Sequence, residues 1–398
     1  MLNQMRTLPY LDLSDPGFST RGDEVAAARA QSWCARTPFG LAVLRYREVG
    51  MILRDRRFGQ GSRKWPDTIG IKGTFADFWR NSVIGREGEA HRRLRAMAVP
   101  ALSDDFVSSL KPEFDSIAEN LCDALRKRDR CEFQTAFCEP FSGQAIATLL
   151  GMNREAWPEV AHDAAALGLA MGVDARKHEK RFNAACARLF RLADGLVEKV
   201  RQGSDRTSYV ARLVAQHDRN ADCTHEELLN TIVISIFGGV DTTRALLGLG
   251  LSLFIEHPDQ WRLLRDDESL VPSAVEEIIR ARPTTTWASR EAMDDIEFNG
   301  EKIPRGTVLH LLVHASARDP QICEDSRFNI AIKRRRHFGF GGGAHHCIGH
   351  FVARTDTACA LSALRRTFRT VSYDGTPEWL PDSGNTGALN LPIRYGVA

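Results

Sequence analysis

The longest helical pattern in the chain begins after Thr224 and runs to about Glu256, and it constrains the fold more than any other segment. Thr224 and Glu227 have the spacing of a capping box, which satisfies backbone N–H groups at the start of a helix. His257-Pro258 marks the end. About thirty residues at 1.5 Å each make a rod of roughly 45 Å, as long as a whole domain. Since apolar residues occur on all its faces, we predict that this helix crosses the protein interior.

The middle of this helix contains Gly238-Gly239-Val240-Asp241-Thr242-Thr243. Two adjacent glycines weaken a buried helix by about 1 kcal/mol each relative to alanine, so we expect the helix to open locally here. The Thr242 hydroxyl can donate to the carbonyl of Gly238 or leave that carbonyl free for water. A widened groove beside an alcohol and a carboxylate suits oxygen binding and proton delivery. The alternative for Asp241 is an ion pair with Arg244, three residues later.

A second segment, Phe340-Gly341-Gly342-Gly343-Ala344-His345-His346-Cys347-Ile348-Gly349, places one cysteine on a glycine-rich loop before an apolar helical pattern. Glycines let the backbone turn tightly and approach a flat ligand closely. A thiolate held in this way can ligate haem iron. Two alternatives are a buried cysteine without chemistry and a zinc ligand beside His345-His346. Zinc sites draw on Cys-x-x-Cys or His-x(3–5)-His spacings, and no such second half accompanies this cluster.

The spacing Phe-x-x-Gly-x-x-x-Cys-x-Gly, with His345 two places before Cys347, resembles the haem-binding loop of the cytochrome P450 family. Glu277-Ile278-Ile279-Arg280 resembles that family's Glu-x-x-Arg signature, a pair that can bond within one helix. The resemblance extends over nearly the whole chain, with the motifs in order. It implies that Glu277 and Arg280 brace the cysteine loop together with a third arginine, for which Arg327 and Arg334 are both candidates.

By the same resemblance, the metal ligand is Cys347 and the cofactor is haem b (iron protoporphyrin IX). Haem has two propionates, which need cations at its edge. His91-Arg92-Arg93-Leu94-Arg95 resembles the family's His-x-x-x-Arg segment. The cofactor-binding residues implied by the resemblance are His91, Arg95, Arg290, His345 and Cys347. The implied catalytic pair is Asp241 and Thr242, with Thr242 holding the hydrogen-bond network and Asp241 relaying protons for cleavage of the O–O bond.

The reaction implied by the family is monooxygenation, in which one atom of O2 enters a lipophilic small molecule and the other leaves as water. We expect a terpenoid, steroid or polyketide-like substrate from secondary metabolism, and electrons from NAD(P)H through a separate ferredoxin or flavodoxin and its reductase. Two alternatives are a peroxide-driven peroxygenase and a haem-binding relative without catalysis. The Asp241-Thr242 pair argues against both.

We expect a mainly α fold with a small β-rich lobe, the roughly triangular cytochrome P450 fold, in one domain over residues 1–398. The haem–thiolate loop is placed at residues 338–349 and the oxygen-activating helix at residues 225–256. The predicted lobe combines the N-terminus, residues 284–312 with a hairpin at Asn299-Gly300, and the C-terminal residues 387–393. Residues 59–85 are interpreted as a long loop. Further helices are predicted at 89–101, 106–127, 141–150, 157–170, 177–202 and from Pro272 to before Pro283.

The composition of the chain limits the classes of protein to which it can belong. A hydrophobic content of 43%, a charged content of 26% and a net charge of +2 are typical of a globular enzyme and do not indicate nucleic-acid binding. Nine scattered cysteines suggest reduced thiols. The first ten residues lack the apolar core of a signal peptide, and Asp241 and Arg244 interrupt the most apolar stretch below membrane-span length. We therefore expect a cytoplasmic monomer without a membrane partner.

Two surfaces follow from these expectations. The substrate pocket is predicted to draw on five segments: 65–79, 167–173, 236–240, 284–287 and 388–390. Four consecutive cations, Lys333 to Arg336, precede the cysteine loop. A solvated face is the ordinary interpretation. Our hypothesis is that these cations, with Arg92 and Arg93, attract an acidic electron-transfer protein.

Overall fold

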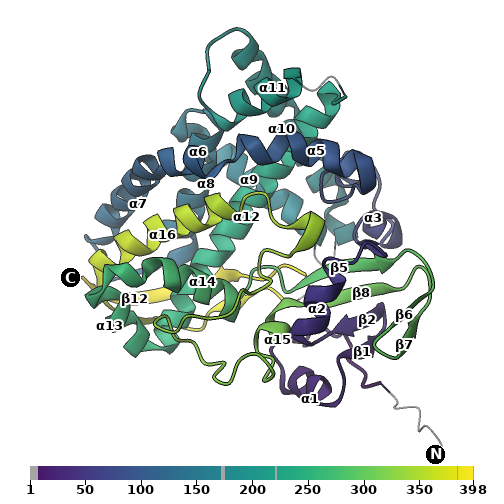
Figure 1. Ribbon diagram of the computed structural model, residues 1–398. Coiled ribbons are helices and arrows are strands. Elements are labelled where there is room, and N and C mark those ends of the chain that lie inside the picture. The colour runs from purple at the N-terminus through teal and green to yellow at the C-terminus, as the bar shows by residue number, and fades with distance from the viewer. Residues whose placement is uncertain (1–7, 172–174, 220–221, 383, 398) are drawn as a thin grey trace, which may run out of the picture.

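The computed structural model describes residues 8–171, 175–219, 222–382 and 384–397. Its helices form most of a roughly triangular body, and the strands of residues 34–43 gather with those of residues 287–312 at one corner (Figure 1). The helix α12 (His225–Glu256) crosses the middle of this body, as its length and apolar faces predict. This arrangement is the mainly α fold with a small β-rich lobe that the sequence indicates, but the C-terminal residues 387–393 do not join that lobe, because they pair in separate small sheets.

The other helices surround α12. In chain order they are α1 (Asp23–Gln31), α2 (Tyr46–Ile52), α3 (Trp65–Thr68), α4 (Thr74–Asn81), α5 (Gly88–Ala101), α6 (Asp104–Ser109), α7 (Lys111–Leu125), α8 (Glu139–Leu150), α9 (Trp157–Gly168), α10 (Glu179–Arg201), α11 (Tyr209–Arg219), α13 (Pro258–Asp266), α14 (Val271–Ala281), α15 (Val313–Ala317) and α16 (His350–Thr367). A single π-helical turn, Gln134–Cys138, leads into α8 among the described residues.

The main sheet has the strand order β1-β2-β8-β5-β3, and all its neighbours are antiparallel except β2 and β8. Three smaller sheets pair β4 and β9 with β12, β6 with β7, and β10 with β11. The strands are β1 (Cys34–Thr37), β2 (Gly40–Val43), β3 (Phe58–Gln60), β4 (Arg130–Glu132), β5 (Trp287–Ala292), β6 (Ile296–Phe298), β7 (Glu301–Ile303), β8 (Val308–Leu312), β9 (Phe368–Tyr373), β10 (Glu378–Trp379), β11 (Ala388–Asn390) and β12 (Pro392–Val397).

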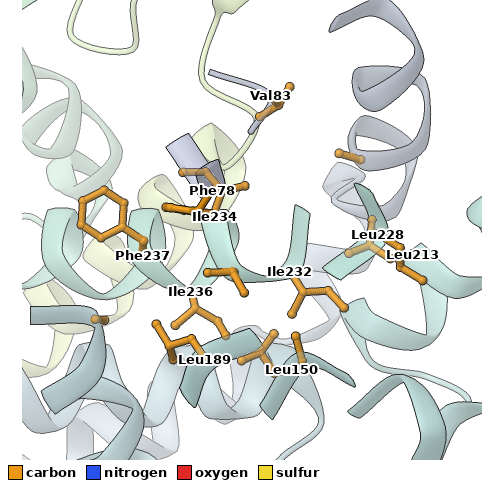
Figure 2. Packing of buried hydrophobic residues seen from close by; sticks show 14 of the residues in the cluster. Phe78, Val83, Leu150, Leu189, Leu213, Leu228, Ile232, Ile234, Ile236 and Phe237 are labelled. Carbon is orange, nitrogen blue, oxygen red and sulfur yellow. The ribbon is translucent and has the colours of Figure 1, made fainter. Parts of the chain in front are cut away.

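The helix α12 is stabilised by a cap at its start and by apolar packing along its length. The capping box at its start is formed, because the Thr224 side chain accepts from the Glu227 N–H and the Glu227 carboxylate accepts from the Thr224 N–H. Its buried side chains interlock with those of α4, α8, α10 and α11 in one apolar cluster (Figure 2). By length and composition α12 could cross a membrane, but two thirds of its most apolar window, 67%, is buried inside the protein. It is therefore the core helix of the fold.

The predicted opening of α12 at its two glycines is wrong, because the helix continues without interruption through Gly238 and Gly239. The weakness of glycine is offset here by packing of the apolar residues on either side. The predicted back-bond is present: the Thr242 hydroxyl donates to the carbonyl of Gly238. The Gly238 carbonyl is thus shared with a side chain even though the helix is intact.

Residues 59–85 are not one long loop, as the sequence suggested, but contain β3, α3 and α4. Their aromatic residues fold this segment onto the core: Trp65, Phe75 and Trp79 contact one another, and Phe75 contacts Phe182 of α10. The helix predicted over 106–127 is divided into α6 and α7, with Pro112 in the first turn of α7. The helices α11 and α13 had not been predicted.

Candidate functional site

The loop that carries Cys347 is closed on itself by backbone hydrogen bonds. The Cys347 N–H donates to the Phe340 carbonyl at 2.9 Å, and the Gly341 N–H donates to the Phe338 carbonyl at 2.8 Å. Gly341 and Gly343 both have φ of +66°, a conformation that glycine adopts without strain. A Cβ atom on Gly343 would lie 1.9 Å from the carbonyl oxygen of Leu53, so the loop packs on the end of α2. The glycines therefore fix the backbone path to the sulfur.

The Cys347 side chain is exposed, whereas six of the other eight cysteines are buried. The protein around Cys347 still desolvates the thiolate, which raises the pKa of the thiol. The Gly349 N–H and the cations Arg95 and Arg354 act in the opposite direction. A cysteine that is both exposed and surrounded by donors and cations differs from the inert buried kind. The structure thus places the sulfur where a ligand can reach it.

Four predicted cations and donors converge on this loop from distant parts of the sequence. The rings of His91 and His345 are 4.0 Å apart. Arg95 on α5 donates to the His346 carbonyl at 2.8 Å, and Arg290 on β5 donates to the Gly342 carbonyl at 3.3 Å. Strand pairing of β5 and the direction of α5 bring these side chains together.

This cluster has an excess of positive charge. Arg290 is only 4% exposed, and no carboxylate among the described residues forms an ion pair with it. Burial lowers the pKa of Arg290 to about 10. His91 is 3% exposed, and its Nε2 atom has no hydrogen-bond partner among the described residues. Burial, together with the charges of His345 and Arg95, lowers the pKa of His91 to about 4. An anionic ligand would satisfy these groups.

One stripe of α12 is not covered by protein. Gly238 is exposed in the middle of a buried helix, and a Cβ atom there would have no neighbour within 4 Å. Thr242, one turn later, lies on the same stripe, whereas Phe237 and Val240 on the flanks are buried. The uncovered stripe therefore presents a backbone surface and one hydroxyl group.

Asp241 is paired in the structure. Arg244 donates to its carboxylate at 3.0 Å, and both side chains are largely buried. Arg244 also lies 3.5 Å from the side chain of Gln134 in the π-helical turn and from the carbonyl of Ala388 on β11. The ion pair that the sequence left as an alternative is therefore formed, and any proton relay through Asp241 has to operate beside Arg244.

The brace predicted for the loop is formed, with Arg334 as the third arginine. Glu277 and Arg280 make two hydrogen bonds of 2.6 and 2.7 Å and are almost completely buried. Arg334 reaches the same carboxylate at 3.5 Å. Arg327 instead pairs with Asp325 at the surface, with 85% of its side chain exposed. The sequence could not decide between the two because the path of residues 323–337 is irregular.

A second brace was missed from the sequence. Glu276 accepts from His337 at 3.1 Å and from Arg354 at 2.5 Å, so it joins α14 to the start of the loop and to α16. These bonds and charges outweigh burial and lower the pKa of Glu276 to about 2. Arg354 also lies over the Phe340 ring, 4.4 Å from its centre. The position of Arg354, two turns after Cys347 on an exposed helix face, was the available signal.

Three of the five predicted pocket segments lie largely in the core. Phe75, Phe78, Leu167 and Ile236 are buried in the cluster around α12. Residues 172 and 173 lie outside the described residues. Leu389 on β11, by contrast, is a large apolar side chain that is 55% exposed. Leu389 on β11 and the uncovered Gly238 on α12 are therefore accessible positions within the predicted segments.

These features together fit a flat, anionic, iron-containing cofactor. The loop offers a thiol that can become a soft anionic ligand. The cluster of His91, Arg95, Arg290 and His345 offers donors for carboxylates, and the uncovered stripe of α12 offers a surface against which a flat group can lie. The fold and the site thus define a protein of the haem–thiolate class.

Comparisons with known proteins agree with this class. The family described as Cytochrome P450 matches residues 169–397. Luteothin monooxygenase of Streptomyces thioluteus is 35% identical over 98% of this chain and 97% of its own. 6-Deoxyerythronolide B hydroxylase of Saccharopolyspora erythraea is 28% identical over 88% of each chain. The crystal structure of CalO2 has a TM-score of 0.88 at 24% identity, covering 96% of this chain and 99% of its own.

The chain therefore belongs to the cytochrome P450 family. It is a haem-binding oxidoreductase of the monooxygenase class, which uses O2 and an organic substrate.

Proposed function

We propose that this cytochrome P450 inserts one atom of O2 into a lipophilic small molecule of secondary metabolism, with haem b ligated by Cys347. The observation that carries the proposal is the exposed thiol of Cys347 on the closed glycine loop, in a protein whose core helix α12 also has an uncovered stripe at Gly238. Haem held in this way supplies the activation of oxygen. The protein supplies the binding, the orientation and the protons.

The charged residues have the role of holding the cofactor. His91, Arg95, Arg290 and His345 would donate to its propionates, which removes the cost of burying Arg290 without an anion. The Gly349 N–H donates to the sulfur and favours the thiolate. The two braces through Glu276 and Glu277 keep the loop in place.

The residues on α12 have the role of delivering protons. The Thr242 hydroxyl lies on the uncovered stripe and would exchange its bond to Gly238 for a bond to water, so that it can hold a proton-conducting hydrogen-bond network. Asp241 precedes Thr242 in α12 and would relay protons while it remains bonded to Arg244. In this proposal Arg244 holds the carboxylate in a fixed place between transfers.

For the substrate we favour a polyketide-like molecule over a terpenoid or a steroid. The support is the name of one relative, the polyketide biosynthesis cytochrome P450 PksS of Bacillus subtilis, 24% identical over 88% of each chain. The exposed Leu389 offers an apolar contact to such a molecule. Electrons would come from NAD(P)H through a ferredoxin or flavodoxin and its reductase.

The proposal is tested on the purified, haem-loaded protein. The reduced protein with carbon monoxide should give the absorption band of thiolate-ligated haem, and Cys347→Ser should abolish that band. Cys323→Ser is the matched control, because Cys323 is also partly accessible and lies before the loop. A panel of polyketides, terpenoids and steroids is then screened for a shift in spin state, followed by product analysis with a ferredoxin system. An unchanged band in Cys347→Ser would contradict the proposed ligand.

The same purified, haem-loaded protein distinguishes the proposed monooxygenase from the peroxygenase alternative. Product formation driven by hydrogen peroxide alone, at a rate that exceeds turnover with O2 and a ferredoxin system, would favour it. We expect the reverse, because a peroxygenase has no need of the Asp241-Thr242 pair.

A further inference from the structure

Glu87 is the acidic residue in contact with the cationic cluster at the cysteine loop. It lies immediately before α5, where Gly88 has φ of +60° and turns the chain into the helix. Its Oε1 atom lies 3.1 Å from Nε2 of His345 and also accepts from the backbone N–H of Gln60 on β3. One carboxylate thus joins β3, the start of α5 and the cysteine loop.

The charge of Glu87 reaches the other members of the cluster as well. It raises the pKa of Arg290 against the larger effect of burial, and it does the same for His91. In return, His345 and His91 help to lower the pKa of Glu87, against the larger opposing effect of desolvation. The carboxylate is therefore ionised and shares its negative charge among side chains that otherwise repel one another.

We propose that Glu87 is a positioning residue that orients His345 towards the cofactor and lowers the reduction potential of the iron. The proposal rests on the proposed function, because it assumes that haem occupies the site. Its first part follows from geometry: a histidine whose Nε2 atom is bonded to a carboxylate has its ring orientation fixed and only Nδ1 left for another partner.

The second part follows from Coulomb's law. Reduction of the iron would add one negative charge to the cofactor, and a fixed carboxylate in this cluster would disfavour that addition. The guanidinium groups of Arg95 and Arg290 would have the opposite effect. Glu87 offsets part of their charge, so its removal should make reduction easier.

The test compares Glu87→Gln with wild type in the haem-loaded protein. Glutamine preserves the size and can still accept from Gln60, but it removes the charge. We expect the midpoint potential of the ferric–ferrous couple to rise, and the difference from wild type to shrink as ionic strength increases. Glu87→Asp, which keeps the charge, should return the potential to near the wild-type value.

The matched control is Glu89→Gln. Glu89 lies two residues later in the first turn of α5, but its side chain is 75% exposed and pairs only with Arg92 among the described residues. The midpoint potential of Glu89→Gln should equal that of wild type. Equal potentials for Glu87→Gln, Glu89→Gln and wild type would overturn the proposal, as would a lowered potential in Glu87→Gln.

The carbon monoxide spectrum distinguishes a failure of the proposed function from a failure of the role proposed for Glu87. A wild-type protein that gives no thiolate-type band contradicts the proposed function and, with it, the role of Glu87. A thiolate-type band in every variant, without the expected shift of potential, leaves the proposed function intact and contradicts only the role of Glu87.

Discussion

Thr243 on α12 donates a hydrogen bond of 3.2 Å to Asp356 on α16, and both side chains are buried. The second carboxylate oxygen of Asp356 accepts from Thr357 at 3.3 Å. No cation pairs with Asp356 among the described residues. The core helix and the helix that follows the cysteine loop are thus joined through a carboxyl group whose pKa burial raises to about 7.

This pKa predicts a pH dependence of stability. Between about pH 4 and pH 7 the folded protein keeps the proton on Asp356 while the unfolded chain loses it, so the free energy of unfolding falls as the pH rises. Asp356→Asn removes this titration and keeps an acceptor for Thr243. We expect the variant to be more stable than wild type by about 4 kcal/mol at pH 8 and nearly equal to it near pH 4.

Urea unfolding at a series of pH values measures the difference. Asp123→Asn is the control, because that side chain is 65% exposed at the surface. A difference between Asp356→Asn and wild type that does not vary with pH would show that Asp356 is ionised throughout.

The two interpretations of Asp241 can be separated by comparing Asp241→Asn with Arg244→Gln. Both variants break the ion pair, but only the first removes the acid. If Asp241 relays protons, Asp241→Asn should lower substrate turnover about 100-fold and increase its solvent isotope effect, since general acid–base groups contribute effects of that order. Arg244→Gln should retain most of the turnover. Equal losses in both variants would mean that the ion pair serves structure alone.

The cations before the cysteine loop give a prediction about electron transfer. Lys333, Arg335 and Arg336 are exposed, whereas Arg334 is engaged with Glu277. Arg92 and Arg93 pair with Glu89 and Glu227, which weakens their part in the hypothesis. Reversing the charge of Lys333, Arg335 and Arg336 should slow reduction by an acidic ferredoxin about tenfold at low salt, with little effect at high salt.

Stopped-flow reduction at several ionic strengths measures this rate. Arg327→Glu is the control, because Arg327 is exposed nearby but already paired with Asp325. Rates that are independent of ionic strength in wild type would remove the electrostatic hypothesis.

A methyl group at Gly343 should be far more damaging than one at Gly195. Its Cβ atom would lie 1.9 Å from the Leu53 carbonyl oxygen, and its φ of +66° is unfavourable for alanine. We expect Gly343→Ala to lose about 3 kcal/mol of stability or more and to bind haem poorly. Gly195→Ala on α10, where a Cβ atom meets nothing within 4 Å, should be as stable as wild type or more so. Thermal unfolding and the haem content after purification compare them.

The sequence predicted those features that depend on neighbours along the chain. The capping box of Thr224 and Glu227, the turn at Asn299-Gly300 and the bond between Glu277 and Arg280 each join positions that are at most three apart, and all three are formed. The turn residues Asn299 and Gly300 have positive φ, as a two-residue hairpin requires. Family resemblance, rather than local pattern, indicated the convergence of His91, Arg290 and His345.

The failures arose where distant contacts decide the structure. The helix α4 has no side-chain cap, and it is stabilised by Phe75 and Trp79 in the core, so its local sequence resembles a loop. Whether α12 opens at Gly238 depends on the packing around the helix, which the low helix propensity of glycine does not describe. Glu87 was missed because the turn at Gly88 and the pairing of β3 bring it to His345, which is 258 residues away.

Glu276 and Glu277 are consecutive on α14, yet they hold different partners: His337 and Arg354 for the first, Arg280 and Arg334 for the second. A single turn of one helix thus anchors the polypeptide on both sides of the sulfur. The strands and turns between residues 284 and 322 do not supply either anchor. Apart from Arg290, which donates to the Gly342 carbonyl of the loop, that stretch could therefore be lengthened, shortened or exchanged between relatives while α14 keeps holding both sides of Cys347.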